Sequence, residues 1–342
     1  MNDQTSRTAV EFDAVNIVFG KKPQEALPLM DAGLERAEIK ARTGQVLGVH
    51  NCSLKVAEGE ILVLMGLSGS GKSTLLRAVN GLNPVVRGEV RVWDGENMRS
   101  VTHAGKSELR SLRLSTVSMV FQQFGLLPWR TVRENVGLGL ELAGRGPAER
   151  DAQVEQQLET VGLSDWADRR VGELSGGMQQ RVGLARAFAT DAPILLMDEP
   201  FSALDPLIRT RLQDELLDLQ ARTRRTIIFV SHDLDEAFKL GNRIALMEGG
   251  RIVQCGTARQ IIANPVNDYV ADFVTHMNPL GVLTVADVVE PGEAAGEPLP
   301  RDMTVREVMT RLAAAEALPV MGGGRVTRAS VLASLLDPQQ AA

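Results

Sequence analysis

The chain has 342 residues, of which 44% are hydrophobic and 23% charged, and its formal net charge is −6. These ordinary globular proportions exclude a disordered or fibrous protein, and the length suits two domains or one large domain with a tail. The acidic balance argues against binding nucleic acid through bulk charge. The two cysteines show no CxxC pattern, which argues against a disulfide scaffold or a zinc module.

No basic segment followed by an apolar stretch opens the chain, so no secretory signal is expected. The longest apolar run, Ile61–Met65, is far shorter than the about 18 residues that a membrane span needs. We therefore expect a cytosolic protein, any membrane role of which comes through a partner.

In chain order, the alternating pattern of residues 9–19 predicts a half-buried strand, and residues 21–47 predict an insertion of one or two helices. The next elements are expected as strands at 49–56 and 61–65, a helix at 72–80 and a strand at 89–93. The wholly apolar run 61–65 is typical of a central strand that is buried on both faces.

Residues 132–190 are rich in helix-forming residues. Two further apolar runs, 194–197 and 226–230, predict buried strands that are separated by a helix over 206–222. This alternation of strands and helices predicts a parallel sheet with helices on both faces. A stretch rich in Pro, Gly and Glu then places a domain boundary between 275 and 302.

Residues 66–74, GLSGSGKST, lie between an apolar strand and a helix and fit the phosphate-binding pattern GxxxxGK[ST]. Glycines let the backbone approach phosphate, whose oxygens the loop N–H groups and the helix N-terminus bind. Lys72 is expected to neutralise the β- and γ-phosphates and Ser73 to coordinate Mg²⁺. The alternative is a glycine turn without a ligand. The expected binding residues are Gly66, Leu67, Ser68, Gly69, Ser70, Gly71, Lys72, Ser73 and Thr74.

Two carboxylates, Asp198 and Glu199, follow the strand 194–197. Ligands bind at the carboxyl ends of strands in open α/β sheets, so we expect Asp198 to hold Mg²⁺ and Glu199 to be the general base toward water. The alternative is a solvated acidic turn. His232 follows the strand 226–230, and we expect it to reach the γ-phosphate rather than only to cap the next helix.

The segment LSGGMQQR, residues 174–181, predicts the start of another helix. Ser175 is a good N-cap, and Gly176 and Gly177 leave backbone N–H groups accessible. By itself this segment is a capped helix start, with phosphate binding as the alternative interpretation.

Taken together and in this order, the motifs resemble an ABC-transporter nucleotide-binding subunit over about residues 9–275. The ordered motifs are the loop 66–74, Gln122 in VFQ, the signature 174–179, the acidic strand 194–199, the SALD segment 202–205 and His232. The resemblance implies a P-loop cassette with a mixed α/β sheet core and a helical subdomain at about 125–185. It also implies ATP and Mg²⁺ as cofactors.

The resemblance assigns further roles. A homodimer is implied, in which the signature residues of one copy act on the γ-phosphate held by the other. Gln122 is implied to touch Mg²⁺ or the attacking water and to sense the permease, and Asp205 to help join the two sites. Phe19 is implied to stack on adenine, with a core phenylalanine as the alternative. The signature residues are Ser175, Gly176, Gly177 and Gln179.

A narrower resemblance is to the importers of glycine betaine, proline betaine and choline, and it rests on the insertion and on segments 65–71, 201–209, 231–237 and 264–270. The C-terminus departs from that group. Its members often carry two CBS modules, whereas residues 303–342 resemble one shortened, degenerate module. The expected organisation is a cassette over 1–275, a linker over 276–302 and this tail. The short tail favours the choline-directed branch.

These resemblances imply an ATPase that powers uptake of a quaternary amine from the cytoplasmic face of the inner membrane. Its partners are then integral-membrane permease subunits and, indirectly, a solute-binding protein, with no nucleic acid. One alternative keeps the importer and changes the cargo to an amino acid or opine. Another, a soluble ABC ATPase on DNA or ribosomes, is disfavoured because only one phosphate loop and no coiled-coil arm occur. The apolar stretch 121–129 is expected as a permease groove or as buried core.

Overall fold

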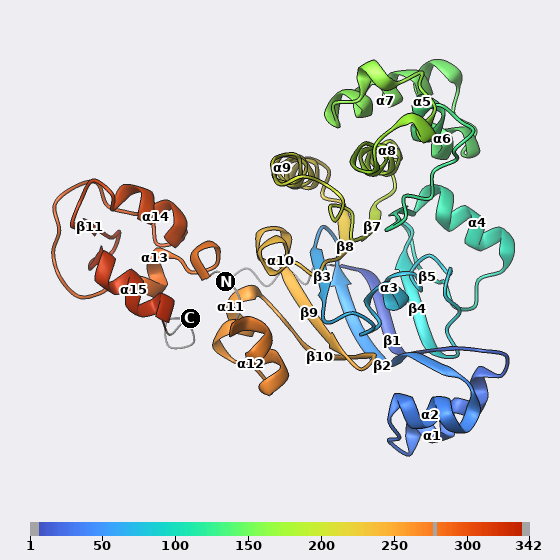
Figure 1. Ribbon diagram of the computed structural model, residues 1–342, viewed down its shortest axis with the longest axis horizontal. Coiled ribbons are helices and arrows are strands. Elements are labelled where there is room, and N and C mark those ends of the chain that lie inside the picture. Colours follow the sequence, from blue (N-terminus) through green and yellow to red (C-terminus); the bar gives the residue numbers. More distant parts are fainter. Residues whose placement is uncertain (1–6, 276–278, 337–342) are drawn as a thin grey trace. The chain divides into compact units, whose positions relative to one another are not determined.

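The computed structural model describes residues 7–275 and 279–336, which pack into two compact units. The first unit comprises the described residues up to His232 together with Met247–Ile252. The second comprises Asp233–Leu246 and the described residues from Val253 onward. Each unit is described by itself, with its elements labelled as in Figure 1.

One sheet of the first unit is antiparallel and has the strand order β2-β1-β4-β5. The expected alternation is confirmed only in the first half of the first strand, where Val10 and Phe12 are buried and Asp13 is exposed, because Val15–Val18 are all buried. The strands are β1 (Thr8–Phe19), β2 (Val46–Ala57), β4 (Arg87–Trp93) and β5 (Met98–Ser100).

The other sheet of this unit contains four parallel neighbours in the order β3-β8-β7-β6, which confirms the predicted parallel sheet. Every residue of β3, β7 and β8 is buried, and this is why their sequences are apolar throughout. Because the strands are parallel, the segments that follow them meet at one edge. The strands are β3 (Ile61–Met65), β6 (Val117–Val120), β7 (Ile194–Asp198) and β8 (Thr226–Val230).

The insertion between β1 and β2 is helical, as expected, with η1 (Pro23–Ala26), α1 (Leu27–Asp31) and α2 (Arg36–Thr43). Its apolar side chains and those of the neighbouring strands form a separate small core. Helix α2 ends at Gly44, whose φ of 68° favours glycine because it is left-handed. The members of this core are Val18, Ala26, Met30, Ile39 and Leu47.

The helix after the phosphate loop, α3 (Lys72–Leu76), is shorter than the predicted 72–80. The N–H groups of Ala78 and Val79 donate to carbonyls three residues earlier, so the helix tightens into turns before Gly81. Helix α4 (Lys106–Ser115) precedes β6.

The predicted helical region is a group of helices, drawn in green in Figure 1. Its members are α5 (Val132–Val136), α6 (Leu138–Leu142), α7 (Pro147–Thr160), η2 (Ser164–Trp166), η3 (Val171–Glu173) and α8 (Gly176–Phe188). Helix α9 (Pro206–Thr223) lies between β7 and β8 in sequence, close to the predicted 206–222. No helix within 7–275 or 279–336 is long and apolar enough to cross a membrane.

The second unit begins with α10 (Leu234–Leu240) and the neighbouring strands β9 (Arg243–Glu248) and β10 (Arg251–Gly256), whose connecting tip belongs to the first unit. Helices α11 (Ala258–Ala263) and α12 (Asp268–Thr275) follow. The later elements are η4 (Pro279–Gly281), α13 (Val285–Val288), α14 (Val305–Arg311), β11 (Ala317–Pro319), β12 (Arg325–Thr327) and α15 (Arg328–Leu336).

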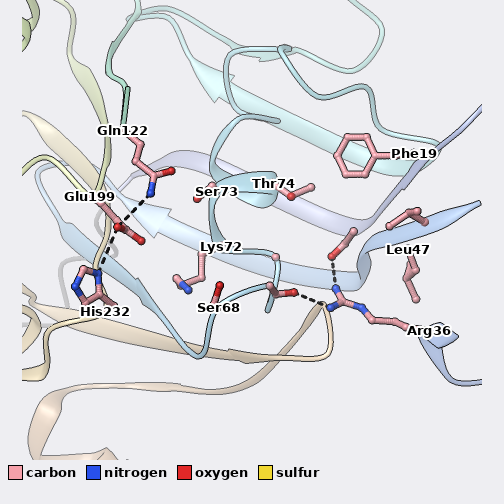
Figure 2. A pocket seen from close by; sticks show the side chains of 14 residues that line it. Phe19, Arg36, Leu47, Ser68, Lys72, Ser73, Thr74, Gln122, Glu199 and His232 are labelled. Atoms are coloured by element: carbon pink, nitrogen blue, oxygen red, sulfur yellow. Dashed lines mark hydrogen bonds and ion pairs between the residues drawn. The ribbon is translucent and has the colours of Figure 1, made fainter. Parts of the chain in front are cut away.

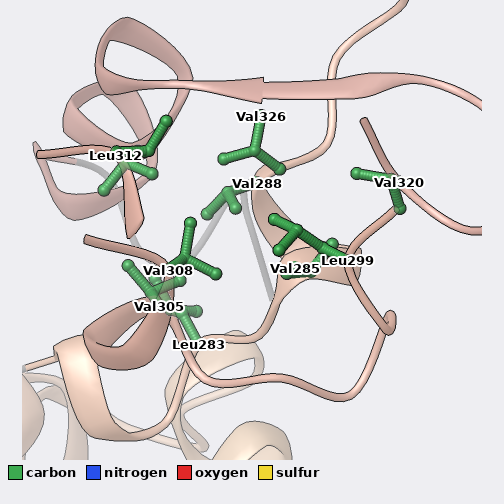
Figure 3. Close-up of a cluster of buried hydrophobic side chains, with 10 residues drawn as sticks. Leu283, Val285, Val288, Leu299, Val305, Val308, Leu312, Val320 and Val326 are labelled. Carbon is green, nitrogen blue, oxygen red and sulfur yellow. The ribbon is translucent and has the colours of Figure 1, made fainter. Parts of the chain in front are cut away.

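These later elements enclose a hydrophobic core of their own, shown in Figure 3. The predicted linker 276–302 is wrong over its described part, because Leu283, Val285 and Leu299 are fully buried in this core. The high Pro and Gly content of that stretch favours a linker, although a few of its apolar residues are buried in the core. The resemblance of the tail to a CBS module stays a prediction. The core consists of Leu283, Val285, Val288, Leu299, Val305, Val308, Leu312, Val320, Val326 and Val331.

Candidate nucleotide-binding site

A pocket of about 530 Å³ in the first unit brings residues from the insertion, both sheets and the phosphate loop together, as Figure 2 shows. One end is aromatic and the other carries a carboxylate, with the loop between them. Its lining consists of Phe19, Arg36, Val46, Leu47, Gly48, Ser68, Gly69, Gly71, Lys72, Ser73, Thr74, Gln122, Glu199 and His232.

The phosphate loop is wrapped around the side chain of Lys72, whose Nζ donates to the carbonyl oxygens of Gly66 (2.8 Å) and Leu67 (3.1 Å). Burial lowers the pKa of Lys72, and the nearby carboxylates of Glu199 and Asp198 oppose that shift. Gly66 has a φ of 139°, and a Cβ there would lie 2.1 Å from the carbonyl oxygen of Met247. A side chain at this position would therefore displace the loop.

Asp198 is fully buried at the end of β7 and is held from two sides. Ser73 Oγ donates to its Oδ1 (2.7 Å), and Arg77 Nη2 donates to its Oδ2 (2.9 Å). Sequence reasoning placed Ser73 and Asp198 together and missed Arg77. The available signal was the spacing, because Ser73 and Arg77 are four residues apart at the start of a helix and so share a face.

The hydroxyl of Ser73 and the carboxylate of Asp198 are adjacent hard-oxygen donors, and this donor set fits Mg²⁺. Within the described ranges no three His, Cys, Asp or Glu side chains are grouped to hold a metal ion. Mg²⁺ binds proteins through one or two side chains, with substrate phosphates and water completing its shell. The pair therefore suits an ion that is bound together with a nucleotide.

The carboxylate of Glu199 is the meeting point of three strand ends. Gln122 Nε2 donates to its Oε2 (3.3 Å), and His232 Nδ1 lies 3.4 Å from the same oxygen, as Figure 2 shows. The backbone of Glu199 has a φ of 48°, a left-handed conformation that costs about 1–3 kcal/mol for a residue other than glycine. The three predicted side chains thus converge, and the local backbone strain aims the carboxylate at the pocket.

A second residue that the sequence did not reveal supports this turn. Gln180, on α8, is almost fully buried; its Nε2 donates to the carbonyl of Glu199 (3.3 Å), and its Oε1 accepts from the N–H of Ala203 (3.0 Å). Ser202 Oγ also donates to the carbonyl of Glu199 (3.0 Å). These hydrogen bonds hold the strained turn in place, and a buried glutamine in a helix gives no sequence signal of such a role.

The aromatic end of the pocket is formed by Phe19, which is 39% exposed and is therefore not a core side chain. Gly48 lies against its ring, since a Cβ at Gly48 would be 2.8 Å from the ring and 3.0 Å from Thr74. The glycine thus leaves the face of the pocket open beside an accessible aromatic ring, a shape that suits stacking of a flat base.

Three predicted residues of the phosphate loop, Gly66, Leu67 and Ser70, do not line this pocket themselves. The predicted nucleotide-binding residues outside the loop and apart from Phe19 also lie outside the pocket: Ser175, Gly176, Gly177, Gln179 and Asp205. Ser175 caps α8, accepting from the N–H of Met178 (3.4 Å), and Asp205 caps α9, accepting from the N–H of Ile208 (3.1 Å). Gln179 Nε2 donates to the carbonyls of Val171 (3.3 Å) and Leu174 (3.0 Å). Within one chain these residues have local roles, and their part in nucleotide binding stays a prediction.

The strand, phosphate loop, buried carboxylate and strained glutamate define a nucleoside-triphosphate-binding cassette of the P-loop class. Residues 49–202 match the family described as ABC transporter. The glycine betaine/proline betaine transport system ATP-binding protein ProV of Salmonella typhimurium is 48% identical over 282 residues, which cover 82% of this chain and 70% of ProV. The chain belongs to the family of ABC-transporter ATP-binding subunits, and it is an ATPase coupled to transport.

Two further comparisons extend this assignment. The trimethylamine N-oxide transport system ATP-binding protein TmoW of Ruegeria pomeroyi is 43% identical over 327 residues, which cover 94% of both chains. The structure of the ATP-binding cassette MJ0796, a dimer bound to ADP and phosphate, matches with a TM-score of 0.63 and 30% identity. That match covers 72% of this chain and 98% of MJ0796.

Proposed function

We propose that this protein powers the import of a small, fully N-alkylated solute through separate permease subunits, supplied by a solute-binding protein. The observation that carries the proposal is the shared cargo chemistry of its relatives. They are described as transporting glycine betaine, proline betaine, carnitine or trimethylamine N-oxide, all of which carry a nitrogen with no N–H to donate. Relatives for spermidine and for methionine are 42% and 39% identical.

Within this class, glycine betaine or proline betaine is the first candidate cargo and trimethylamine N-oxide the second. The second is favoured by a specific observation, because the similarity to TmoW extends over 94% of both chains, whereas that to ProV covers 82% of this chain. Choline remains a member of the class without support of its own.

For hydrolysis, we propose that Phe19 stacks on adenine while the loop and Lys72 bind the phosphates. Mg²⁺, when bound, would neutralise phosphate charge, and Ser73, Asp198 and Gln122 are the residues that would hold it. Glu199 Oε2 accepts a proton from the attacking water, and His232 and Gln122 orient that carboxylate from either side.

Helix α8, which begins at the signature residues, completes the site in this proposal. Its N-terminus in a second copy of the chain faces the γ-phosphate, contributing Ser175, Gly176, Gly177 and Gln179, while Asp205 helps to join the two sites. The dimeric form described for MJ0796 supports this arrangement. A site that needs both copies ties hydrolysis to closure of the dimer.

We place the protein at the cytoplasmic face of the inner membrane, held there by the permease. The stretch after the Gln122 loop supports this docking, because Trp129 is 69% exposed and projects from a segment that also contains Leu126 and Leu127. Replacing Trp129 with Ala should then lower the ATPase stimulation that the permease provides and leave the basal ATPase of the isolated protein unchanged.

The cargo assignment is tested by uptake of labelled solutes in a strain that lacks this protein. Glycine betaine, proline betaine, choline and trimethylamine N-oxide are compared with methionine and spermidine as controls, and the wild-type gene is restored in a second strain. The proposal expects loss of uptake of at least one N-alkylated solute and its return on complementation. Loss restricted to methionine, spermidine or another amine with free N–H groups would contradict it.

A further inference from the structure

The insertion at residues 21–47 contributes one charged side chain to the nucleotide pocket. Arg36, the first residue of α2, projects from the insertion and lines the pocket, as Figure 2 shows. Its Nη1 donates to the carbonyl of Gly69 in the phosphate loop (2.7 Å), and its Nη2 donates to the carbonyl of Gly48 on β2 (2.6 Å). One guanidinium therefore joins the phosphate end of the pocket to the aromatic end.

The bond to Gly69 fixes a particular peptide unit of the loop. The carbonyl of that unit accepts from Arg36, and its N–H, which belongs to Ser70, donates to the carbonyl of Leu67 (3.1 Å). The plane between Gly69 and Ser70 is thereby held from both sides, at a residue whose φ of 79° is otherwise free to change. A loop that is already ordered needs less reorganisation when it binds phosphate.

The hydrogen bond from Nη2 to Gly48 attaches the other side of the Arg36 guanidinium to β2. Gly48 lies against the ring of Phe19 at the aromatic end of the pocket, and its carbonyl serves as an anchor point for the guanidinium. Arg36 itself is positioned by the insertion core, since Ile39 of the same helix is fully buried there. A bidentate bond between Asp31 and Arg87 (2.8 and 2.9 Å) ties α1 to β4 as well.

The charge of Arg36 also matters, because both of its hydrogen bonds go to neutral carbonyl oxygens. Its Nε is buried and has no hydrogen-bond partner within the described ranges. Burial lowers the pKa of Arg36, which reflects the cost of keeping this charge away from water. An anionic ligand in the pocket would offset that cost, and a nucleoside triphosphate is such a ligand.

We propose that Arg36 is a positioning residue of the nucleotide site, through which the N-terminal insertion holds the phosphate loop in its binding shape and favours polyphosphate over nucleoside. The proposal concerns the nucleotide alone and holds whichever solute is carried. The insertion then takes part in nucleotide binding and is more than an added surface element.

The test measures equilibrium binding of ATP, ADP and adenosine to the full-length protein by isothermal titration calorimetry and by competition. Arg36→Ala removes both bonds and the charge, whereas Arg36→Lys keeps the charge but cannot bridge two carbonyls. Arg42→Ala is the matched control, because Arg42 lies on the same helix, is exposed and, among the described residues, pairs with Glu38 one turn away. Thermal unfolding of each ligand-free variant reports whether it is folded.

Bonds from a charged donor are worth about 1.5–3 kcal/mol, so Arg36→Ala should weaken ATP and ADP binding by roughly 10- to 100-fold. Adenosine binding should stay within about twofold of wild type, Arg36→Lys should lie between wild type and Arg36→Ala, and Arg42→Ala should match wild type. Wild-type ATP affinity in Arg36→Ala would overturn the proposal, as would an equal loss for ATP and adenosine. If Arg36→Ala does not fold, wild-type ATP affinity in Arg36→Lys overturns the proposal equally.

Discussion

The pairing of Arg77 with Asp198 leads to a prediction whose size can be worked from the structure. Asp198 is fully buried, and its carboxylate has two partners, the hydroxyl of Ser73 and the guanidinium of Arg77. Replacing Arg77 with Met keeps most of the side-chain volume and removes the charge. The carboxylate then stays buried with one neutral donor.

Breaking a buried ion pair costs about 3–5 kcal/mol because it leaves an uncompensated charge. Here the side chain of Arg77 is 36% exposed, so water reaches the vacated position and the cost falls to about 2–3 kcal/mol. For a unit of this size that corresponds to a fall in Tm of roughly 5–10 °C.

The assay is unfolding of ligand-free protein by heat and by urea, followed by circular dichroism. Arg77→Lys should recover part of the loss because it restores the charge without the planar guanidinium. Arg110→Met serves as the control, since Arg110 is exposed on α4 and its substitution should shift stability by less than about 0.5 kcal/mol. Equal stability of Arg77→Met and Arg110→Met would refute the reasoning that Arg77 neutralises Asp198.

Three further predictions concern other parts of the chain. Glu199→Gln should lower the ATPase rate by about 10²–10⁴-fold while ATP still binds, as single-turnover and binding assays would report; near-normal turnover would remove Glu199 as the base. Burial raises the pKa of Cys52 to about 11, so its thiol should resist Ellman's reagent at pH 8 in the folded protein, where Cys255 is the more accessible. The neutral Cys52 thiol adds stability below about pH 9 that is lost as the pH rises toward 11; rapid labelling of both thiols in folded protein would contradict this. Asp287→Ala removes a buried carboxylate that accepts two hydrogen bonds from Thr284, the N-cap residue of α13 (both 2.8 Å). The variant's C-terminal segment should therefore be cut faster by protease while its basal ATPase rate stays at the wild-type level. An unchanged rate of proteolysis would argue that these two bonds do not stabilise the segment.

Much of the site was predictable because each of its main segments directly follows an apolar strand. The phosphate loop follows a wholly apolar strand, and Glu199 and His232 each follow another. Parallel pairing of those strands then brings the strand ends to one edge, which explains why residues far apart in sequence converge around a single carboxylate oxygen.

The supporting residues were not predictable for an equally physical reason. Arg36 and Gln180 act through long side chains whose partners are set by packing rather than by spacing, and each lies in a helix where arginine or glutamine is ordinary. Arg77, the residue that ends α3, had only its spacing from Ser73 as a signal. The interval 276–302 reads as a linker because composition averages over residues, whereas Leu283, Val285 and Leu299 within it are fully buried. When the apolar residues of a small core are widely spaced, the average composition of the segment does not reveal them.

The central claim, that this cassette hydrolyses ATP to import an N-alkylated solute, is tested most directly by ATPase measurements on the complete transporter in proteoliposomes. The protein is reconstituted with its permease, and the binding protein is added with glycine betaine or trimethylamine N-oxide. We predict that one of these solutes stimulates ATP hydrolysis and is taken up, and that both effects disappear in Glu199→Gln. An ATPase rate that neither solute raises, or solute uptake that persists in Glu199→Gln, would contradict the claim.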